Sequence, residues 1–185
     1  MSSSIDLQPT SIDGLMVVSR NPVGDSRGFL ERLYCHETLA PLLRGARIEA
    51  VNRTVTSRRG TVRGLHFQHP PHAEDKIVAC LRGEVFDVAV DLRRGSPTFL
   101  KWHAETLSQD NSRSFLIPRG FAHGFQTLTE ECELLYLHTA AYRRESEGGI
   151  DALDPRIAVR WPIAITERSA RDGQHPRLDD SFLGI

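Results

Sequence analysis

The sequence predicts an all-β domain, a barrel or sandwich of antiparallel strands, from three observations. Short segments of alternating apolar and polar residues recur along the chain, turns such as Arg94–Pro97 separate them, and only one segment has the spacing of a helix. Many short, regularly spaced strands with so little helix are typical of antiparallel barrels, the jelly roll among them. A chain of 185 residues can bury a core without disulfides or a structural metal, so we expect one domain over residues 1–185.

Each expected element follows from a local pattern. The expected strands, in chain order, are Leu15–Arg20, Ile48–Ser57, Thr61–Gln68, Lys76–Arg82, Glu84–Leu92, Phe99–Thr106, Arg113–Ile117 and Cys132–Thr139. In Glu84–Leu92, alternation puts the large apolar side chains on one face and Asp87, Ala89 and Asp91 on the other. A short helix is expected at His36–Arg44, because its leucines share a face before Gly45 ends it.

The two ends of the chain are expected to flank the barrel. Residues from 1 to about 22 should form an N-terminal arm or strand. The segment from about 163 to 185 follows Trp161-Pro162, is irregular in pattern, and is expected to fold back over the barrel.

Composition bounds the setting of the protein. A formal net charge of -1 offers no basic excess for nucleic acid, and no apolar run approaches the roughly 20 residues that span a bilayer. The start of the sequence has no basic region followed by an apolar stretch, so no secretory signal is expected. Three cysteines without metal-ligand spacing indicate reduced thiols in a cytoplasmic protein.

The centre of the candidate chemistry is Thr61–Gln68. His66 and Gln68 are two residues apart on an expected strand, so their side chains share a face. If that face lines a barrel pocket, the His66 imidazole can act as a general base. A lone histidine of this kind is also commonly a buried structural residue with a hydrogen-bond partner, and this segment leaves both interpretations open.

A second cluster, Ile117–Phe125, surrounds His123 with Pro118 and Gly120, which indicates a tight turn that delivers the histidine into a pocket. The two clusters together resemble the cupin pattern, in which one motif brings H-x-H plus a glutamate and the next brings P-x-G-x-x-H. The first motif is met here by one histidine where two are expected. Two histidines without a carboxylate are a poor ligand set for a catalytic metal, so we expect a cupin-type barrel with no metal or other cofactor.

A longer series of motifs resembles the dTDP-4-dehydrorhamnose 3,5-epimerase family, in order and with nearly unbroken spacing from about Val23 to Leu178. The segments that carry the resemblance are Arg63–Gln68, Lys76–Val78, Gly83–Arg93, Ser96–Phe99, Ile117–Phe125, Glu133–Tyr136, Asp154-Pro155 and Trp161-Pro162. The family inverts the carbons on either side of the C4 ketone in a nucleotide-linked 4-keto-6-deoxy sugar. This chemistry needs a base, a group that stabilises the enolate oxygen, and a proton donor on the opposite face.

The resemblance implies a role for each of four residues. His66 matches the base and Asp172 the carboxylate that orients it, as in other histidine–aspartate dyads. Lys76 matches the enolate stabiliser, and Tyr136 matches the proton donor. Without the resemblance, Asp172 would be interpreted as a solvated loop residue, Lys76 as a surface lysine and Tyr136 as a core aromatic residue.

Other residues match the pocket and the subunit contact of the family. The candidates for binding the diphosphate are Arg63, Arg27 and Arg171. The candidates for contacting or orienting the substrate are His123, Asp87 and Gln68. The wall around the sugar is expected to include Asn52 and Tyr142. The resemblance also implies a homodimer in which the N-terminal strand crosses to the partner. There, Phe29 and Glu31 would complete the neighbouring site.

The sequence departs from the family pattern in two places. The family has R-G-x-F-x-E, whereas Arg27–Arg32 places Glu31 one position early, which on a strand moves a side chain to the other face. Ala50–Thr54 likewise replaces the common Q-x-N-x-S. A CDP-linked sugar therefore stays an alternative to the dTDP-linked one, and inversion of one carbon stays an alternative to inversion of both.

Functions of other classes also remain open at this point. A metal-dependent cupin would have to recruit His69, His72 or Glu74 as extra ligands. A non-catalytic sugar-binding barrel would have no use for the four matched residues together, and Tyr136 and Asp172 argue against a 3,4-ketoisomerase on the same barrel. An epimerase would serve deoxysugar assembly, either for cell-surface polysaccharide or for a glycosylated metabolite.

Overall fold

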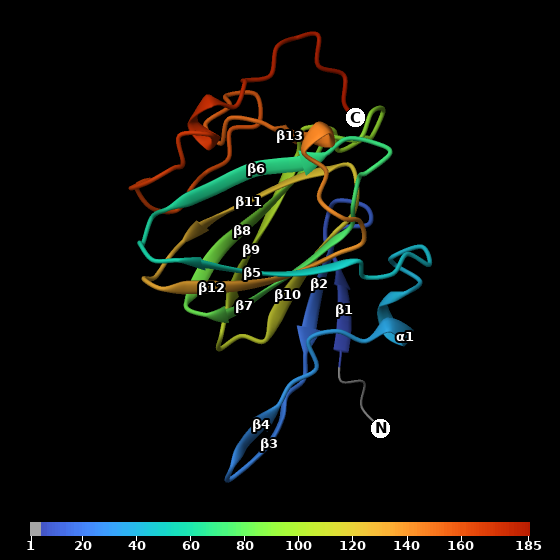
Figure 1. Cartoon of the computed structure of the whole chain (residues 1–185), viewed down its shortest axis with the longest axis vertical. Coiled ribbons are helices and arrows are strands. Elements are labelled where there is room, and N and C mark those ends of the chain that lie inside the picture. Colours follow the sequence, from blue (N-terminus) through green and yellow to red (C-terminus); the bar gives the residue numbers. More distant parts are fainter. Residues whose placement is uncertain (1–4) are drawn as a thin grey trace.

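Two antiparallel β-sheets packed face to face form the body of the protein in the computed structural model, which describes residues 5–185 (Figure 1). The six-stranded sheet has the order β1 (Ile5–Pro9), β2 (Met16–Arg20), β10 (Arg113–Ile117), β7 (Lys76–Arg82), β12 (Cys132–His138) and β5 (Ala50–Thr56). The five-stranded sheet has the order β13 (Glu147–Gly149), β6 (Val62–Gln68), β11 (Phe121–Thr127), β8 (Glu84–Asp91) and β9 (Trp102–Ser108). The prediction of an all-β, cupin-type jelly roll is confirmed.

The main core fills the space between the two sheets. Val78 and Leu134 contribute from the six-stranded sheet, and Val85 and Phe125 contribute from the five-stranded sheet. This inner layer follows from the period of two along each strand, which sends alternate side chains to opposite faces. Ala89 lies in this inner layer, one position from Val88 in the outer one, as the alternation predicts.

Both outer faces are covered by other parts of the chain. The C-terminal segment, drawn in orange to red, lies over the five-stranded sheet, where Trp161 and Phe182 pack against a buried cluster that includes Val90 (Figure 1). On the other side, Leu39 and Leu43 pack against the outward side chains of the six-stranded sheet. Apolar residues on both faces of the strands are therefore buried, which explains why several strands are almost entirely apolar.

A two-stranded hairpin, β3 (Val23–Asp25) and β4 (Gly28–Leu30), projects away from the barrel (Figure 1). Val23, Phe29 and Leu30 are 74%, 71% and 78% exposed on it, so this hairpin makes little contact with its own chain. Among the described residues, no helix has the length and apolar composition that crossing a membrane requires.

Three sequence predictions differ from the structure. His123 was expected in a tight turn, but it lies in the middle of strand β11, and the turn precedes it at Pro118–Gly120. The expected helix His36–Arg44 is regular only as α1 (His36–Leu39), because Pro41 has no N–H to continue the ladder. The described part also contains β1, β3, β4, β11 and β13, short or glycine-rich strands that alternation did not identify.

Candidate active site

A cavity of about 410 Å³ opens between the inner faces of the two sheets at one end of the barrel. Its lining includes Asn52, Thr54, Arg63, His66, Lys76, His123, Tyr136, His138, Arg171 and Asp172. A second lobe of about 300 Å³ adjoins it, since Asn52, His66, Lys76 and His138 line both. The polar side chains that line the cavity therefore lie together in the space between the two sheets.

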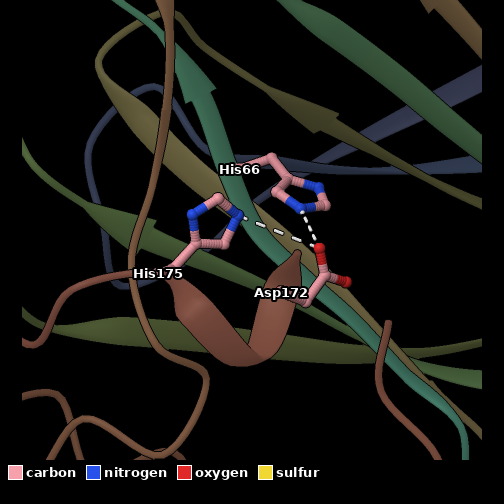
Figure 2. A group of neighbouring side chains, drawn as sticks. All are labelled: His66, Asp172 and His175. Carbon is pink, nitrogen blue, oxygen red and sulfur yellow. Dashed lines mark hydrogen bonds and ion pairs between the residues drawn. The ribbon is translucent and has the colours of Figure 1, made fainter. Parts of the chain in front are cut away.

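His66 and Asp172 form a hydrogen-bonded pair at the edge of this cavity. The Nε2 atom of His66 lies 2.9 Å from Oδ1 of Asp172, which stands on the short 3-10 turn Asp172–Gln174 of the C-terminal segment (Figure 2). The His66 side chain is about one third exposed, whereas that of Asp172 is buried. An imidazole held by a buried carboxylate and open to the cavity on its other side is equipped to accept a proton there.

An irregularity in the sheet supplies a second hydrogen bond to Asp172. Between His66 and Arg63, strand β6 has one residue more than β11 has between His123 and Phe125. Gly64 sits in this bulge with φ +120°, and a Cβ there would lie 2.6 Å from the Cα atom of Gly124, so both positions require glycine. The bulge leaves the Gly64 N–H free to donate to Oδ2 of Asp172 at 3.2 Å.

The environment of Asp172 keeps it ionised. Burial acts to raise the pKa of this carboxyl, but the hydrogen bond with His66, the charge of that imidazole and the Gly64 N–H lower it to about 2. Because Asp172 is anionic at neutral pH, it can only accept a hydrogen bond, so Nε2 of His66 carries the proton and donates it. The Nδ1 atom of His66 is then the ring nitrogen that carries a lone pair.

Tyr136 lies on the facing sheet, in a row of inward side chains. It is paired with Asn52 across β12 and β5, and its ring is 5.9 Å from that of His123, in an edge-to-face arrangement. Burial, together with the charge of Asp87, raises the pKa of Tyr136, so the hydroxyl keeps its proton at neutral pH. His66 and Tyr136 come from opposite sheets and line one cavity.

His123 and Asp87 form a second, fully buried pair behind Tyr136. The Nε2 atom of His123 lies 2.9 Å from Oδ1 of Asp87, on neighbouring strands β11 and β8. Burial raises the pKa of Asp87, an effect that His123 opposes. The Nε2 atom of His123 is thereby committed to Asp87 and orients the ring beside Tyr136.

Lys76 enters the cavity from β7, next to His138 in the sheet register. Its Nζ atom lies 3.0 Å from Oε1 of Glu74, and both side chains are buried. Gln68 donates its amide to Glu74 and to the carbonyl oxygen of His72, and its Oε1 accepts from the Arg143 N–H. Gln68 therefore holds Glu74, which in turn holds Lys76.

The structure brings most of the predicted site residues together. Arg63, Asn52 and Arg171 line the main cavity, and Gln68 and Tyr142 line the adjoining lobe. Tyr142 is largely exposed and donates to Glu147, to which Arg171 is also ion-paired.

Besides Asp87, which is buried behind the cavity lining, three predicted residues do not reach the cavity within the chain. Arg27 and Phe29 lie on the projecting hairpin, where Arg27 is ion-paired with Asp25. Glu31 follows the hairpin and approaches the buried Arg20 at 3.4 Å. Glu31, which stands one position earlier than in the family pattern, therefore has an ion-pair partner within its own chain.

Two histidines near the cavity, His138 and His175, were not predicted from the sequence. His138 is stacked on Tyr136, with ring centroids 5.9 Å apart, and burial together with the Lys76 charge lowers its pKa to about 4. Its spacing of two from Tyr136 on a strand could have identified it. His175 lies against His66 from the irregular C-terminal segment, where no periodicity exists to reveal a neighbour.

One group among the described residues has the donors of a metal site. The ligand atoms of His66, Asp172 and His175 all lie within 4.8 Å of one another. The two cupin-motif histidines, His66 and His123, face each other across β6 and β11, but each is bonded to its own aspartate.

Fold and cavity together define a cupin-type barrel enzyme equipped for proton transfer at a carbon beside a carbonyl group. The family model described as dTDP-4-dehydrorhamnose 3,5-epimerase matches residues 9–180. This chain therefore belongs to the dTDP-4-dehydrorhamnose 3,5-epimerase family, and the resemblance inferred from its motifs is confirmed.

Individual relatives agree with this assignment. The chain is 42% identical to a dTDP-4-dehydrorhamnose 3,5-epimerase of Salmonella typhimurium, over 94% of this chain and 96% of that one. It is 37% identical to a dTDP-4-dehydrorhamnose 3-epimerase of Streptomyces niveus, over 90% and 80%. A crystal structure of a dTDP-6-deoxy-D-glucose-3,5-epimerase from Legionella pneumophila in complex with dTDP-4-keto-L-rhamnose superposes with a TM-score of 0.90 at 38% identity, covering 97% of each chain.

Proposed function

We propose that this protein is an isomerase that epimerises a nucleotide-linked 4-keto-6-deoxy sugar of the dTDP-4-dehydro-6-deoxyglucose type at C3, C5 or both. The observation that carries the proposal is the convergence of a His–Asp pair, a buried lysine and a buried tyrosine on one cavity between two sheets. Membership of the epimerase family supports the same reaction.

His66 is proposed as the base that removes the proton next to the ketone. Because Asp172 is ionised and bonded to Nε2, the basic atom is Nδ1, on the side of the ring away from Asp172. As Nδ1 takes the proton, the imidazolium that forms is stabilised by the adjacent carboxylate. Asp172 therefore orients the base and lowers the energy of its charged form.

Lys76 is proposed to stabilise the enolate. Its ammonium group is held by Glu74 inside the barrel, where a charge interacts more strongly with a developing oxyanion than it would in water. The Glu74 carboxylate offsets part of the lysine charge. The stabilisation that Lys76 supplies therefore increases as negative charge develops on the C4 oxygen of the substrate.

Tyr136 is proposed to deliver a proton to the face opposite His66. Its hydroxyl is protonated at neutral pH because burial raises its pKa, and it belongs to the sheet that faces the sheet of His66. Removal of a proton from one face of the planar enolate and return to the other face inverts the carbon. His123, ordered by Asp87, supports the Tyr136 ring from behind.

The remaining cavity residues are proposed as substrate contacts. Arg63 and Arg171 supply guanidinium groups suited to a diphosphate, and Asn52, Tyr142 and Gln68 border the space around the sugar. We favour a dTDP-linked sugar because relatives of both the 3,5- and the 3-epimerase type carry that name. The reducing cytoplasm suits Cys35, Cys80 and Cys132, all of which are free thiols.

We further propose a homodimer in which the hairpin of one chain completes the site of the other. The hairpin exposes Phe29 and Leu30, and the edge strand β5 beside the cavity exposes Val51 and Val55. Exposed apolar side chains near an open sheet edge favour pairing with another strand. Arg27, Phe29 and Glu31 would then act in the partner site.

The test is solvent exchange followed by NMR. The protein is incubated with dTDP-4-keto-6-deoxyglucose in deuterium oxide, and the C3 and C5 protons are followed with the product stereochemistry. We expect wild-type protein to exchange and invert, and His66→Asn to do neither. Tyr136→Phe should still exchange protons through His66 but should not invert the carbon.

Each departure from this pattern has a meaning. Exchange at one carbon alone would identify a mono-epimerase. Absence of exchange in the wild type with both the dTDP- and the CDP-linked sugar would overturn the proposed reaction. Unchanged inversion by Tyr136→Phe would remove Tyr136 from the role of donor.

A further inference from the structure

His175 presents a buried nitrogen without a hydrogen-bond partner to the His–Asp pair. Its side chain is 14% exposed, and its Nε2 atom lies 3.8 Å from Oδ1 of Asp172, too far for a hydrogen bond (Figure 2). A buried polar atom left without a partner costs free energy comparable to a lost hydrogen bond. The epimerase reaction proposed above assigns nothing to His175.

The three donors of this cluster converge on a small volume. His66 Nε2 and Asp172 Oδ1 are 2.9 Å apart, Asp172 Oδ1 and His175 Nε2 are 3.8 Å apart, and all three atoms lie within 4.8 Å of one another. Around a tetrahedral zinc ion with bonds of about 2.0–2.2 Å, ligand atoms are separated by about 3.3–3.5 Å. Side-chain shifts of about 1 Å or less would bring the three donors to that geometry.

The elements that carry the donors are firmly held. The Gly64 N–H fixes the second oxygen of Asp172, and Arg168 donates to the Asp172 carbonyl oxygen at 2.8 Å. The His175 ring lies directly over Gly149, where any Cβ would collide with it, and its edge contacts the ring of His66. Two imidazoles and one carboxylate form the ligand set of many divalent transition-metal sites.

We propose that His66, Asp172 and His175 bind a divalent transition-metal ion of the zinc type, and that this ion inhibits the enzyme. The inhibitory part rests on the proposed function, whereas the metal binding does not. The ion would not be a cofactor. It would inhibit the enzyme, because it would hold His66 in a form that cannot act as the base.

Inhibition follows from the two nitrogens of His66. In the active pair, the 2.9 Å hydrogen bond commits Nε2 to Asp172, so Nε2 carries the proton and Nδ1 has the free lone pair. A metal ion on Nε2 needs the lone pair at that atom, so the single proton of the neutral ring must reside on Nδ1. The nitrogen that faces the substrate then cannot accept a proton, and the dyad hydrogen bond is replaced by coordination to the same carboxylate oxygen.

The experiment uses the full chain, freed of metal with a chelator that is then dialysed away. Zn²⁺ is titrated by calorimetry, and Co²⁺ binding is followed by its visible absorption. Wild-type protein should bind one ion per chain. His175→Phe, which keeps a flat ring over Gly149, should weaken binding at least about tenfold. His36→Phe, at an exposed histidine outside the cluster, should bind as the wild type does.

Epimerisation is measured with the same proteins. Without metal, His175→Phe should retain the wild-type rate. Saturating Zn²⁺ should slow the wild type at least about a hundredfold, the scale of a lost general base, and should slow His175→Phe far less at the same concentration. His175→Asn serves as a second variant if the phenylalanine variant does not fold.

The outcomes separate the two proposals. Metal binding that is absent, or unchanged in both His175 variants, would overturn the metal site. Binding that depends on His175 without any inhibition would overturn the inhibitory role. A protein that shows His175-dependent Co²⁺ absorption but no epimerisation would support the metal site and count against the proposed function.

Discussion

The side chains of His66 and Asp172 meet at 2.9 Å although 106 positions separate them in the chain. His66 belongs to the seven-residue strand β6, whereas Asp172 belongs to a segment with almost no regular structure. The orientation of the proposed base therefore depends on how firmly the C-terminal segment is held against the barrel. Both the chemistry and the stability of this junction can be tested.

Asp172→Asn should slow epimerisation about 10²–10⁴-fold with a smaller change in KM. The amide keeps the volume of the carboxylate but cannot stabilise the imidazolium, and it can favour the wrong tautomer of His66. Steady-state kinetics with the 4-keto sugar measures this effect. Asp180→Asn, at an exposed carboxylate of the same segment, is the control, and a full rate for Asp172→Asn would exclude a role in orienting the base.

Asp151→Asn should loosen the C-terminal segment. Asp151 accepts from Arg168 at 2.6 Å and from Arg177 at 3.0 Å, and Arg168 also holds the Asp172 backbone. Weakening these charged hydrogen bonds should lower the free energy of unfolding by about 1–3 kcal/mol. Urea denaturation measures the loss, and hydrogen exchange should increase at residues 168–177. If exchange rises uniformly through the barrel, the effect is not local to this segment.

His138 should make the protein less stable in acid. Its pKa is about 4 in the folded protein because of burial and the Lys76 charge, against an ordinary value of 6.5. The unfolded chain thus takes up the proton first, and stability falls as pH decreases from about 6.5 to 4, by up to about 2–3 kcal/mol. His138→Phe keeps a stacked ring on Tyr136 but cannot titrate. Its stability should fall less steeply over this range in urea denaturation, and parallel curves would contradict the assignment.

Asp91 should contribute stability that is also lost in acid, but at a lower pH than for His138. Burial acts to raise its pKa, but hydrogen bonds from Arg93, Ser96 and Thr98 lower it to about 2, from 3.8. Its contribution is complete above about pH 4 and is lost as pH falls toward 2, with a size of about 2 kcal/mol. Asp91→Asn should remove that contribution at neutral pH. A thermal melt at pH 7 that matched the wild type would show that the turn after β8 does not need the charge.

Phe29→Ser should weaken the proposed dimer. The side chain is 71% exposed in the single chain, so its replacement costs the isolated fold little, while an interface that covered it would lose apolar contact. Analytical ultracentrifugation should show a shift from dimer to monomer. Leu183→Ser, at another exposed apolar residue, should leave the mass unchanged. A wild-type chain that sediments as a monomer would remove the dimer proposal.

Much of the fold could be predicted because its signals are local. The alternation in Glu84–Leu92 depends only on neighbours along one strand, and it correctly placed Asp87 and Ala89 on one face. Strand β11 was missed because Gly124 and His123 interrupt its apolar pattern, so its cluster was interpreted as a turn. Gly64 could not be assigned a purpose from sequence, since its bulge exists only opposite Gly124.

The sequence by itself determined the all-β class, which side chains of a strand share a face, and the family with its set of expected site residues. It could do so because alternation and motif spacing are properties of the chain alone. Only the tertiary structure decided that Asp172 meets His66, that Glu74 holds Lys76, and that His138 and His175 stand beside the proposed base and acid. Those contacts join a sheet to another sheet or to an irregular segment, and their distances depend on packing that no local pattern encodes.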